Sequence, residues 1–118
     1  MKRSRIKPKV SDFEREFQAM KPYVYERAEM GCEAETFARE YTKRIPTIDA
    51  RLSVLPLCGG RATNVHHRKY RSRRGSNRIE NLIALCGPCH AWIHAHPEES
   101  NRLGLSLHAG ESEELSAI

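Results

Sequence analysis

The chain has 118 residues, a length that fits one domain. Hydrophobic residues make up 39% and aromatic residues 7%, so the core is thin and a bound metal ion would help the chain to fold. No stretch resembles a transmembrane helix or a secretory signal. We therefore expect a cytoplasmic protein that does not act at a membrane.

Charge is distributed unevenly along the chain. The 20 Lys and Arg residues exceed the 15 Asp and Glu residues, which gives a formal net charge of +5. Basic residues gather in an arm at residues 1–10 and again in residues 68–78, whereas Glu111, Glu113 and Glu114 make the end acidic. Charge runs often lie simply in solvent. A basic arm together with a basic loop nevertheless suggests a phosphate-rich partner.

The first predicted helix follows the flexible arm. Ser11 or Asp12 can cap it, and apolar residues recur after the cap at helical spacing: Phe13, Phe17 and Met20. Pro22 interrupts this pattern and fits the first turn of a second helix that runs to about Met30.

The middle of the chain has weaker patterns. A short helix around Ala38 ends before Pro46, and closely spaced apolar residues lead into Cys58. The residues around Val65 are predicted to form a strand. Residues 68–77 show no periodic pattern of apolar residues and are predicted to form a loop. Apolar residues then recur from Ile79 to Leu85 and precede Cys86.

Two short helices are predicted near the C-terminus. Pro88 fits the first turn of a helix over residues 88–95. Pro97 fits the start of a second helix, and Gly104 lies just beyond its end. Residues 108–118 are small and acidic, and we expect a disordered tail there.

The chain has four cysteines: Cys32, Cys58, Cys86 and Cys89. In a reducing cytosol they indicate metal ligands before disulfides. Cys86 and Cys89 form a Cys-x-x-Cys pair, a spacing that lets both thiolates reach one tetrahedral ion. With Cys32 and Cys58 they predict a structural four-cysteine zinc site.

Two alternatives to this zinc site stay open. In most zinc ribbons the first cysteine pair is also closely spaced, whereas 25 residues separate Cys32 from Cys58. Either the chain carries an insertion there, or one of the two is not a ligand and Cys32 is an ordinary buried thiol. A thiol–disulfide oxidoreductase could also use Cys86 and Cys89, although no βαβ pattern surrounds them.

Five of the six histidines fall in two clusters, residues 66–67 and residues 90–96. His90 and His94 lie four residues apart on a predicted helix, so both rings project from one face and can bind one metal ion. Neighbouring side chains of a strand point to opposite sides, so one of His66 and His67 can bind metal while the other faces a substrate. This arrangement suits metal-assisted phosphodiester hydrolysis, in which a neutral imidazole takes a proton from water.

Together these motifs resemble the HNH endonucleases, and more narrowly the short zinc-containing HNH proteins of bacteriophages. The matching motifs are Val65-His66-His67-Arg68, Asn81-Leu82, and Leu85 to His90 followed by His94. The resemblance implies an α+β fold with a small ββα-metal (His-Me finger) domain stapled by the zinc site. One HNH domain would span residues 11–107, with a helical part at 11–31, a zinc and ββα-metal core at 32–96 and a short helix at 97–104.

The resemblance also implies residue roles. His67 matches the general base, and Asn81 matches the asparagine that braces the loop carrying the base, although it could be a simple turn residue. His66, where many relatives have aspartate, would bind a catalytic divalent metal ion with His90 and His94. A three-nitrogen site suits transition metals better than magnesium. The identity of this ion stays open among Mg²⁺, Mn²⁺, Ni²⁺ and Zn²⁺.

The implied function is a metal-dependent DNA endonuclease that nicks or cuts both strands with little sequence specificity. Basic loop residues are expected to contact DNA phosphates: Arg68, Lys69, Arg71, Arg73 and Arg74. Relatives of this size imply a role in phage DNA processing or packaging, with terminase or portal partners, in the cytoplasm of a bacterial host. The alternatives are a non-catalytic zinc module that binds DNA or a partner protein, and an accessory packaging protein.

Overall fold

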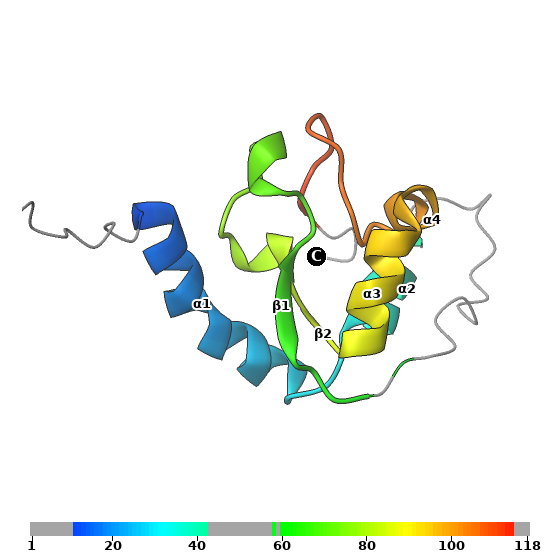
Figure 1. Cartoon of the computed structure of the whole chain (residues 1–118), viewed down its shortest axis with the longest axis horizontal. Coiled ribbons are helices and arrows are strands. Elements are labelled where there is room, and N and C mark those ends of the chain that lie inside the picture. Colours follow the sequence, from blue (N-terminus) through cyan, green and yellow to red (C-terminus); the bar gives the residue numbers. More distant parts are fainter. Residues whose placement is uncertain (1–10, 43–57, 59, 115–118) are drawn as a thin grey trace, which may run out of the picture.

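The computed structural model describes residues 11–42, 58 and 60–114. Its centre is an antiparallel pair of strands, β1 (Asn64–His67) and β2 (Leu82–Leu85), followed by helix α3 (Gly87–Ala95). Helix α1 (Asp12–Ala28) lies on one side of the strands and α3 on the other (Figure 1). Helix α2 (Ala34–Thr42) contacts β2, and the short α4 (Pro97–Arg102) contacts α3. The structure thus confirms a small α+β fold with a ββα order at its centre.

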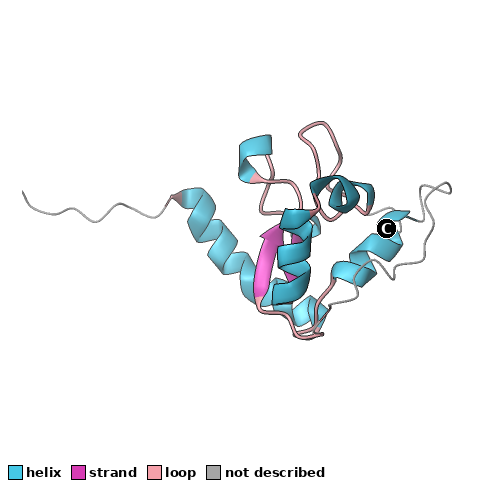
Figure 2. Ribbon diagram, turned by 45° about the vertical axis from the view of Figure 1, so that its right-hand side comes forward, coloured by secondary structure: helices cyan, strands magenta, loops and turns pink. Residues whose placement is uncertain are grey.

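The strand register places the two neighbouring histidines on different sides of the strand pair. His66 lies opposite Ile83, and His67 lies opposite Leu82. Ile83 packs with residues of α2 and α3, whereas Leu82 packs with Val24 of α1. All four residues of β2 are buried because helices cover both faces of the strands (Figure 2). Since side chains alternate along a strand, His66 faces α3 and His67 faces α1.

Helix α1 differs from the sequence prediction. It runs without a break from Asp12 to Ala28 with Pro22 inside it, so the predicted second helix starting at Pro22 is wrong. A proline in a helix interior costs about 3 kcal/mol. Packing of α1 on the core offsets that cost. The apolar side chains before and after the proline that belong to one core cluster are Phe17, Met20, Val24, Tyr25 and Ala28. Glu29 follows the last residue of the helix and caps it with a left-handed φ of 52°.

A partly buried ion pair fixes the end of α1 to the strand pair. Arg27 donates two hydrogen bonds to the Glu33 carboxylate, at 2.7 and 2.6 Å. It also donates to the carbonyls of Ile79 and Leu82. Glu33 in turn accepts from the Ala84 amide at 3.0 Å. These bonds set the position of the segment that carries Cys32.

The other described elements largely follow the predictions. The helix expected around Ala38 is α2, and it begins at Ala34. The strand around Val65 and the helices after Cys86 and at Pro97 are confirmed. The loop of residues 68–81 contains two short 3-10 turns, η1 (Arg71–Arg73) and η2 (Ile79–Asn81). The predicted arm at 1–10 and the apolar residues before Cys58 lie outside the described residues.

Residues 108–114 are expected from the sequence to be part of a disordered tail, but they form hydrogen bonds with other segments of the chain. Glu113 is buried, and its carboxylate accepts from the amide and hydroxyl of Ser76. The Glu111 carboxylate accepts from the His108 amide and from Asn101, both at 2.7 Å. These acidic residues find partners in distant segments, which composition alone does not reveal. None of the described helices has the length and apolar character that a membrane crossing requires.

Candidate metal and catalytic site

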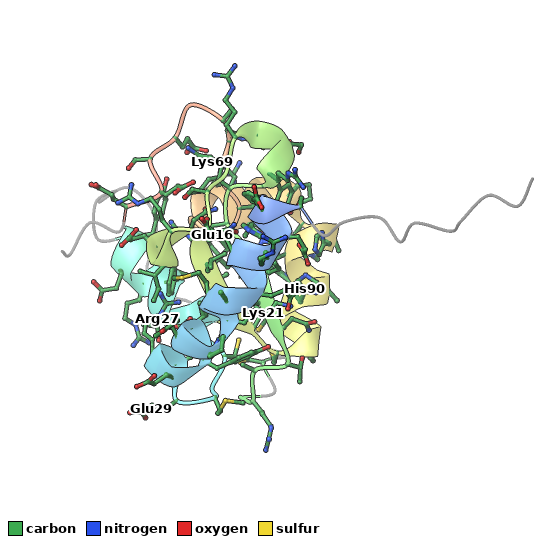
Figure 3. The ribbon with its side chains drawn as sticks, turned by 90° about the vertical axis from the view of Figure 1, so that its left-hand side faces the viewer. Glu16, Lys21, Arg27, Glu29, Lys69 and His90 are labelled. Atoms are coloured by element: carbon green, nitrogen blue, oxygen red, sulfur yellow. The ribbon has the colours of Figure 1, made fainter. Side chains whose placement is uncertain are left out.

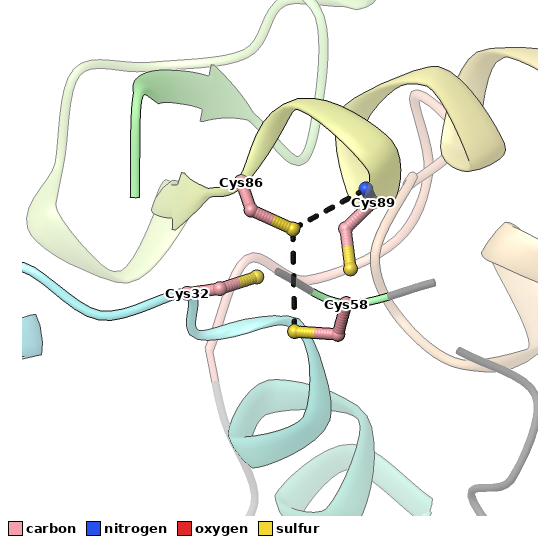
Figure 4. A group of neighbouring side chains, drawn as sticks. All are labelled: Cys32, Cys58, Cys86 and Cys89. Carbon is pink, nitrogen blue, oxygen red and sulfur yellow. Dashed lines mark hydrogen bonds between the residues drawn. The ribbon is translucent and has the colours of Figure 1, made fainter. Parts of the chain in front are cut away.

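The four cysteines meet although they come from distant segments. Their sulfur atoms all lie within 4.8 Å of one another and converge on one point (Figure 4). The Sγ atoms of Cys58 and Cys86 are 4.0 Å apart, and none of the four described cysteines forms a disulfide. A tetrahedral zinc site with Zn–S bonds of about 2.3 Å has sulfur–sulfur distances of about 3.8 Å. The cluster therefore has the size and donor set that a zinc ion requires.

The 25-residue gap between Cys32 and Cys58 is closed by local pairing. Gly31 forms an antiparallel bridge with Arg61, and the Cys32 amide donates to the Gly60 carbonyl at 2.8 Å. The other two ligands come from the start of α3. Cys86 caps this helix, and its sulfur accepts from the Cys89 amide at 3.4 Å. Both halves of the cluster are thus positioned by backbone hydrogen bonds.

Burial raises the pKa of the Cys32 thiol to about 11. Burial, with the hydrogen bond to Cys86, also raises the pKa of the Cys89 thiol. A reactive redox thiol needs a lowered pKa. The direction of both shifts therefore disfavours a thiol–disulfide oxidoreductase.

Three histidines form a second cluster on the α3 side of the strands. One ring nitrogen from each of His66, His90 and His94 lies within 4.8 Å of the other two. The Nε2 atoms of His90 and His94 are 3.1 Å apart. Metal–nitrogen bonds of about 2.0–2.1 Å hold neighbouring ligand nitrogens roughly 3.0–3.4 Å apart. In Figure 3, which faces α1, His90 emerges on α3 beside that helix.

His66 lies at the buried end of this cluster. Its side chain is 5% exposed, and its Nε2 atom has no hydrogen-bond partner among the described residues. Burial, aided by His90 and His94, lowers the pKa of His66 to about 3, so its ring is neutral. The backbone of Leu105 hydrogen-bonds the ring, and with Nε2 unpartnered this bond falls on Nδ1.

An unpaired buried nitrogen costs roughly 1–3 kcal/mol, and a metal ion would remove this cost. Metal-binding histidines commonly use one ring nitrogen as the ligand while the other donates to a backbone carbonyl. Burial, with the nearby His94, also lowers the pKa of His90, which favours the neutral form of that ring. The three residues therefore fit a divalent metal ion.

His67 occupies the opposite side of the strand pair, against α1. Its ring stacks on Phe13 with ring centres 5.5 Å apart and contacts Phe17 at 4.4 Å. Its Nε2 atom lies 2.7 Å from Oδ1 of Asn77. Two aromatic side chains and one amide thus fix the orientation of the half-buried imidazole.

Asn81 is fully buried beneath the loop that follows His67. Its Oδ1 accepts from the Lys69 amide at 2.7 Å. Its Nδ2 donates to the carbonyls of Lys69 and Ser76, at 3.0 and 2.8 Å. All three partners belong to the loop that joins the strands, so the Asn81 side chain ties this loop together, which a surface turn residue would not do.

The basic loop divides into buried and exposed residues. Arg68 is fully buried and donates to the backbone carbonyls of Gly104, Glu80 and Glu113. The predicted contact of Arg68 with a DNA phosphate is therefore wrong. Arg71 and Arg74 are exposed, and Lys69 and Arg73 are half-buried. Arg71 lies over the Phe13 ring, and Lys69 lies at the top of Figure 3.

The structure adds side chains that sequence reasoning did not single out. Tyr70 lies edge-on to His66 at 5.5 Å and stacks with His94 at 6.3 Å. Asn77 and the two phenylalanines of α1 surround His67. More than 50 residues separate Phe13 from His67, and nothing in the sequence indicates which core surface α1 would cover.

The comparisons with known proteins agree with this geometry. Residues 56–96 match the family model described as HNH endonuclease. The match includes both strands and α3, and with them the histidine cluster, His67 and Asn81. No curated protein and no solved structure gives a significant match to the chain. Residues 56–96 of this chain are therefore similar to HNH endonucleases.

Proposed function

We propose that this protein is a metal-dependent endonuclease that hydrolyses phosphodiester bonds in DNA. The observation that carries the proposal is the unpartnered buried Nε2 of His66, which lies beside ring nitrogens of His90 and His94. A purely structural histidine would have a partner for that nitrogen. The adjacent His67 lies outside this cluster and is free for a different role.

Each of these side chains would have a separate role in hydrolysis. His66, His90 and His94 would hold a divalent ion, which when bound stabilises negative charge on the phosphate and the leaving oxygen. His67 would accept the proton of the attacking water. General-base help of this kind typically accounts for about 10²–10⁴ in rate. Asn81 would keep the loop after His67 in place through its three backbone hydrogen bonds.

The donor sets favour different ions at the two clusters. Four thiolates suit zinc, which would staple the domain. Three imidazoles suit Zn²⁺ or Ni²⁺, while phosphate oxygens of the substrate would add ligands that Mn²⁺ and Mg²⁺ prefer. We therefore expect cleavage with transition metals, and expect Mg²⁺ to serve less well.

The DNA would lie across the basic loop. Arg71 and Arg74 are exposed there, and Lys69 and Arg73 are partly exposed. Contacts from such side chains to phosphates position a duplex without reading its sequence. We therefore propose low sequence specificity.

A plasmid assay tests the proposed activity. We expect the zinc-loaded wild-type protein to convert supercoiled plasmid to nicked or linear DNA when Mn²⁺ or Ni²⁺ is added. His67→Ala should lower the rate by about 10²–10⁴ while zinc content stays unchanged.

His96→Ala is the matched control, because His96 is exposed, lies close to His94 in the sequence and belongs to neither cluster. This variant should cut at the wild-type rate. Absence of cleavage by the wild type with every metal, or equal rates for wild type and His67→Ala, would contradict the proposed function.

A further inference from the structure

We propose that Asn77 is a positioning residue that holds the proton of His67 on Nε2 and leaves the Nδ1 lone pair free to accept a proton from water. The inference rests on the proposed role of His67 as general base. It assigns to Asn77 a task that differs from that of Asn81. The amide of Asn81 bonds to the backbone of Lys69 and Ser76, whereas the amide of Asn77 bonds to the His67 ring itself.

The orientation of the Asn77 amide follows from its partners. Asn77 is 4% exposed, and its Nδ2 donates to the Phe13 carbonyl at 2.8 Å. A carbonyl oxygen can only accept, so the amino group must face Phe13 and Oδ1 must face His67. The opposite orientation would set two oxygens against each other and leave the buried amide unsatisfied.

This orientation fixes the tautomer of His67. The Asn77 oxygen, 2.7 Å from Nε2, can only accept, so Nε2 must carry the hydrogen. A neutral imidazole has one N–H group, which leaves Nδ1 as the acceptor. The ring cannot easily turn to exchange its nitrogens, because Phe13 and Phe17 pack against it.

The loop before Asn77 is built to bring the amide to this place. Gly75 packs against the Lys69 backbone, and a Cβ atom there would lie 1.7 Å from the Lys69 oxygen. Only glycine permits this approach. The other support is the Phe13 carbonyl on α1, outside the matched residues 56–96. Helix α1 therefore contributes to the orientation of the proposed base through one backbone oxygen.

Long-range ¹H–¹⁵N NMR of the zinc-loaded protein, at a pH where the ring is neutral, tests this directly. The His67 signals are assigned by their loss in His67→Gln. We expect wild-type His67 to show a protonated Nε2 and an unprotonated Nδ1. Asn77→Leu has similar size but no acceptor, so it should give a mixture of tautomers. Asn77→Asp keeps an acceptor oxygen and should keep the proton on Nε2.

Cleavage rates supply a second readout. Removing the hydrogen-bond partner of a metal-binding imidazole typically costs about 10- to 100-fold, and we expect a loss of at least this size in the rate of Asn77→Leu. Asn77→Asp should recover most of the rate. The matched control is Asn101→Leu, which removes a different partly buried amide that donates to the Ser106 carbonyl. This control should leave the His67 tautomer unchanged.

Each result decides the proposal. Wild-type His67 with its proton on Nδ1 would overturn it, as would an unchanged tautomer in Asn77→Leu. If Asn77→Leu fails to fold, Asn77→Asp still tests the point, because an unprotonated Nε2 in that variant contradicts the assignment. The NMR result does not depend on cleavage. A wild-type protein that shows the expected tautomer but does not cut DNA would contradict the proposed function alone.

Discussion

Two neighbouring histidines show how environment separates the roles of identical side chains. His66 faces α3, is buried, and has a pKa lowered to about 3 by that burial and by the nearby histidines. His67 faces α1 and is half-buried between aromatic rings and an amide. The alternation of a four-residue strand is enough to place one in the three-histidine cluster and the other at a different surface.

Replacement of Arg68 and replacement of Arg71 should have different effects on stability and on DNA binding. Arg68→Met removes a buried guanidinium that donates hydrogen bonds to three backbone carbonyls. This substitution should destabilise the protein by at least about 2 kcal/mol, because the carbonyls lose their donor. Arg71→Met removes an exposed charge. It should change stability by less than about 0.5 kcal/mol and lower the slope of log affinity against log salt by about 1.

Urea unfolding and DNA binding at several salt concentrations separate these effects. The assignment of Arg68 to the core and Arg71 to the DNA surface fails if the two variants exchange behaviours. It fails equally if Arg71→Met leaves the salt dependence unchanged.

At the scale of elements, α1 is held by tertiary contacts against a local penalty. Its apolar residues pack on the strand pair on both sides of Pro22. Arg27 and Glu33 fix its C-terminal end, and the Phe13 carbonyl engages Asn77 near its N-terminal end. The helix is thus joined to the loop of residues 68–81 and to the segment that carries Cys32.

Pro22→Ala should stabilise the protein. Pro22 is exposed, so the change disturbs little packing, and it restores a backbone donor inside α1. We expect a gain of about 1–3 kcal/mol in the free energy of unfolding of zinc-saturated protein, measured in urea. A loss of stability would mean that the strands need the helix geometry that the proline imposes.

The sequence predicted those elements whose signals are local. Cys86-x-x-Cys89, the histidines four residues apart and the strand at Val65 each follow from short spacing rules. It did not predict a continuous α1, because packing across Pro22 outweighs the helix-breaking tendency. Nor did it predict the burial of Arg68 or the surroundings of His67, because both depend on which distant segments meet.

At the scale of the whole molecule, the cysteine cluster lies where separate parts of the chain converge. It joins the segment after α1, the segment before β1 and the start of α3. Two small buried clusters flank β2, and one of them includes Cys86 and Cys89. A metal ion there would join segments that little apolar surface holds together.

Cys89→Ser should therefore largely unfold the protein. Structural zinc contributes about 10–16 kcal/mol in small finger peptides, comparable with the roughly 5–15 kcal/mol net stability of a domain. Circular dichroism and zinc content measure the outcome. Ala91→Ser, on the exposed side of α3, is the control and should stay folded. A cooperative, chelator-resistant fold in Cys89→Ser would contradict a structural zinc site.

The most direct test of the central claim is the rate of DNA cleavage as a function of free Mn²⁺ concentration, with wild type, His90→Ala and His96→Ala compared at equal zinc content. If His66, His90 and His94 hold the ion that cleavage needs, His90→Ala should require at least about tenfold more Mn²⁺ for half-maximal rate, because a ligand is lost. His96→Ala should follow the wild-type curve. Cleavage by His90→Ala at the Mn²⁺ concentration that half-saturates the wild type, at an undiminished rate, would contradict the three-histidine metal site.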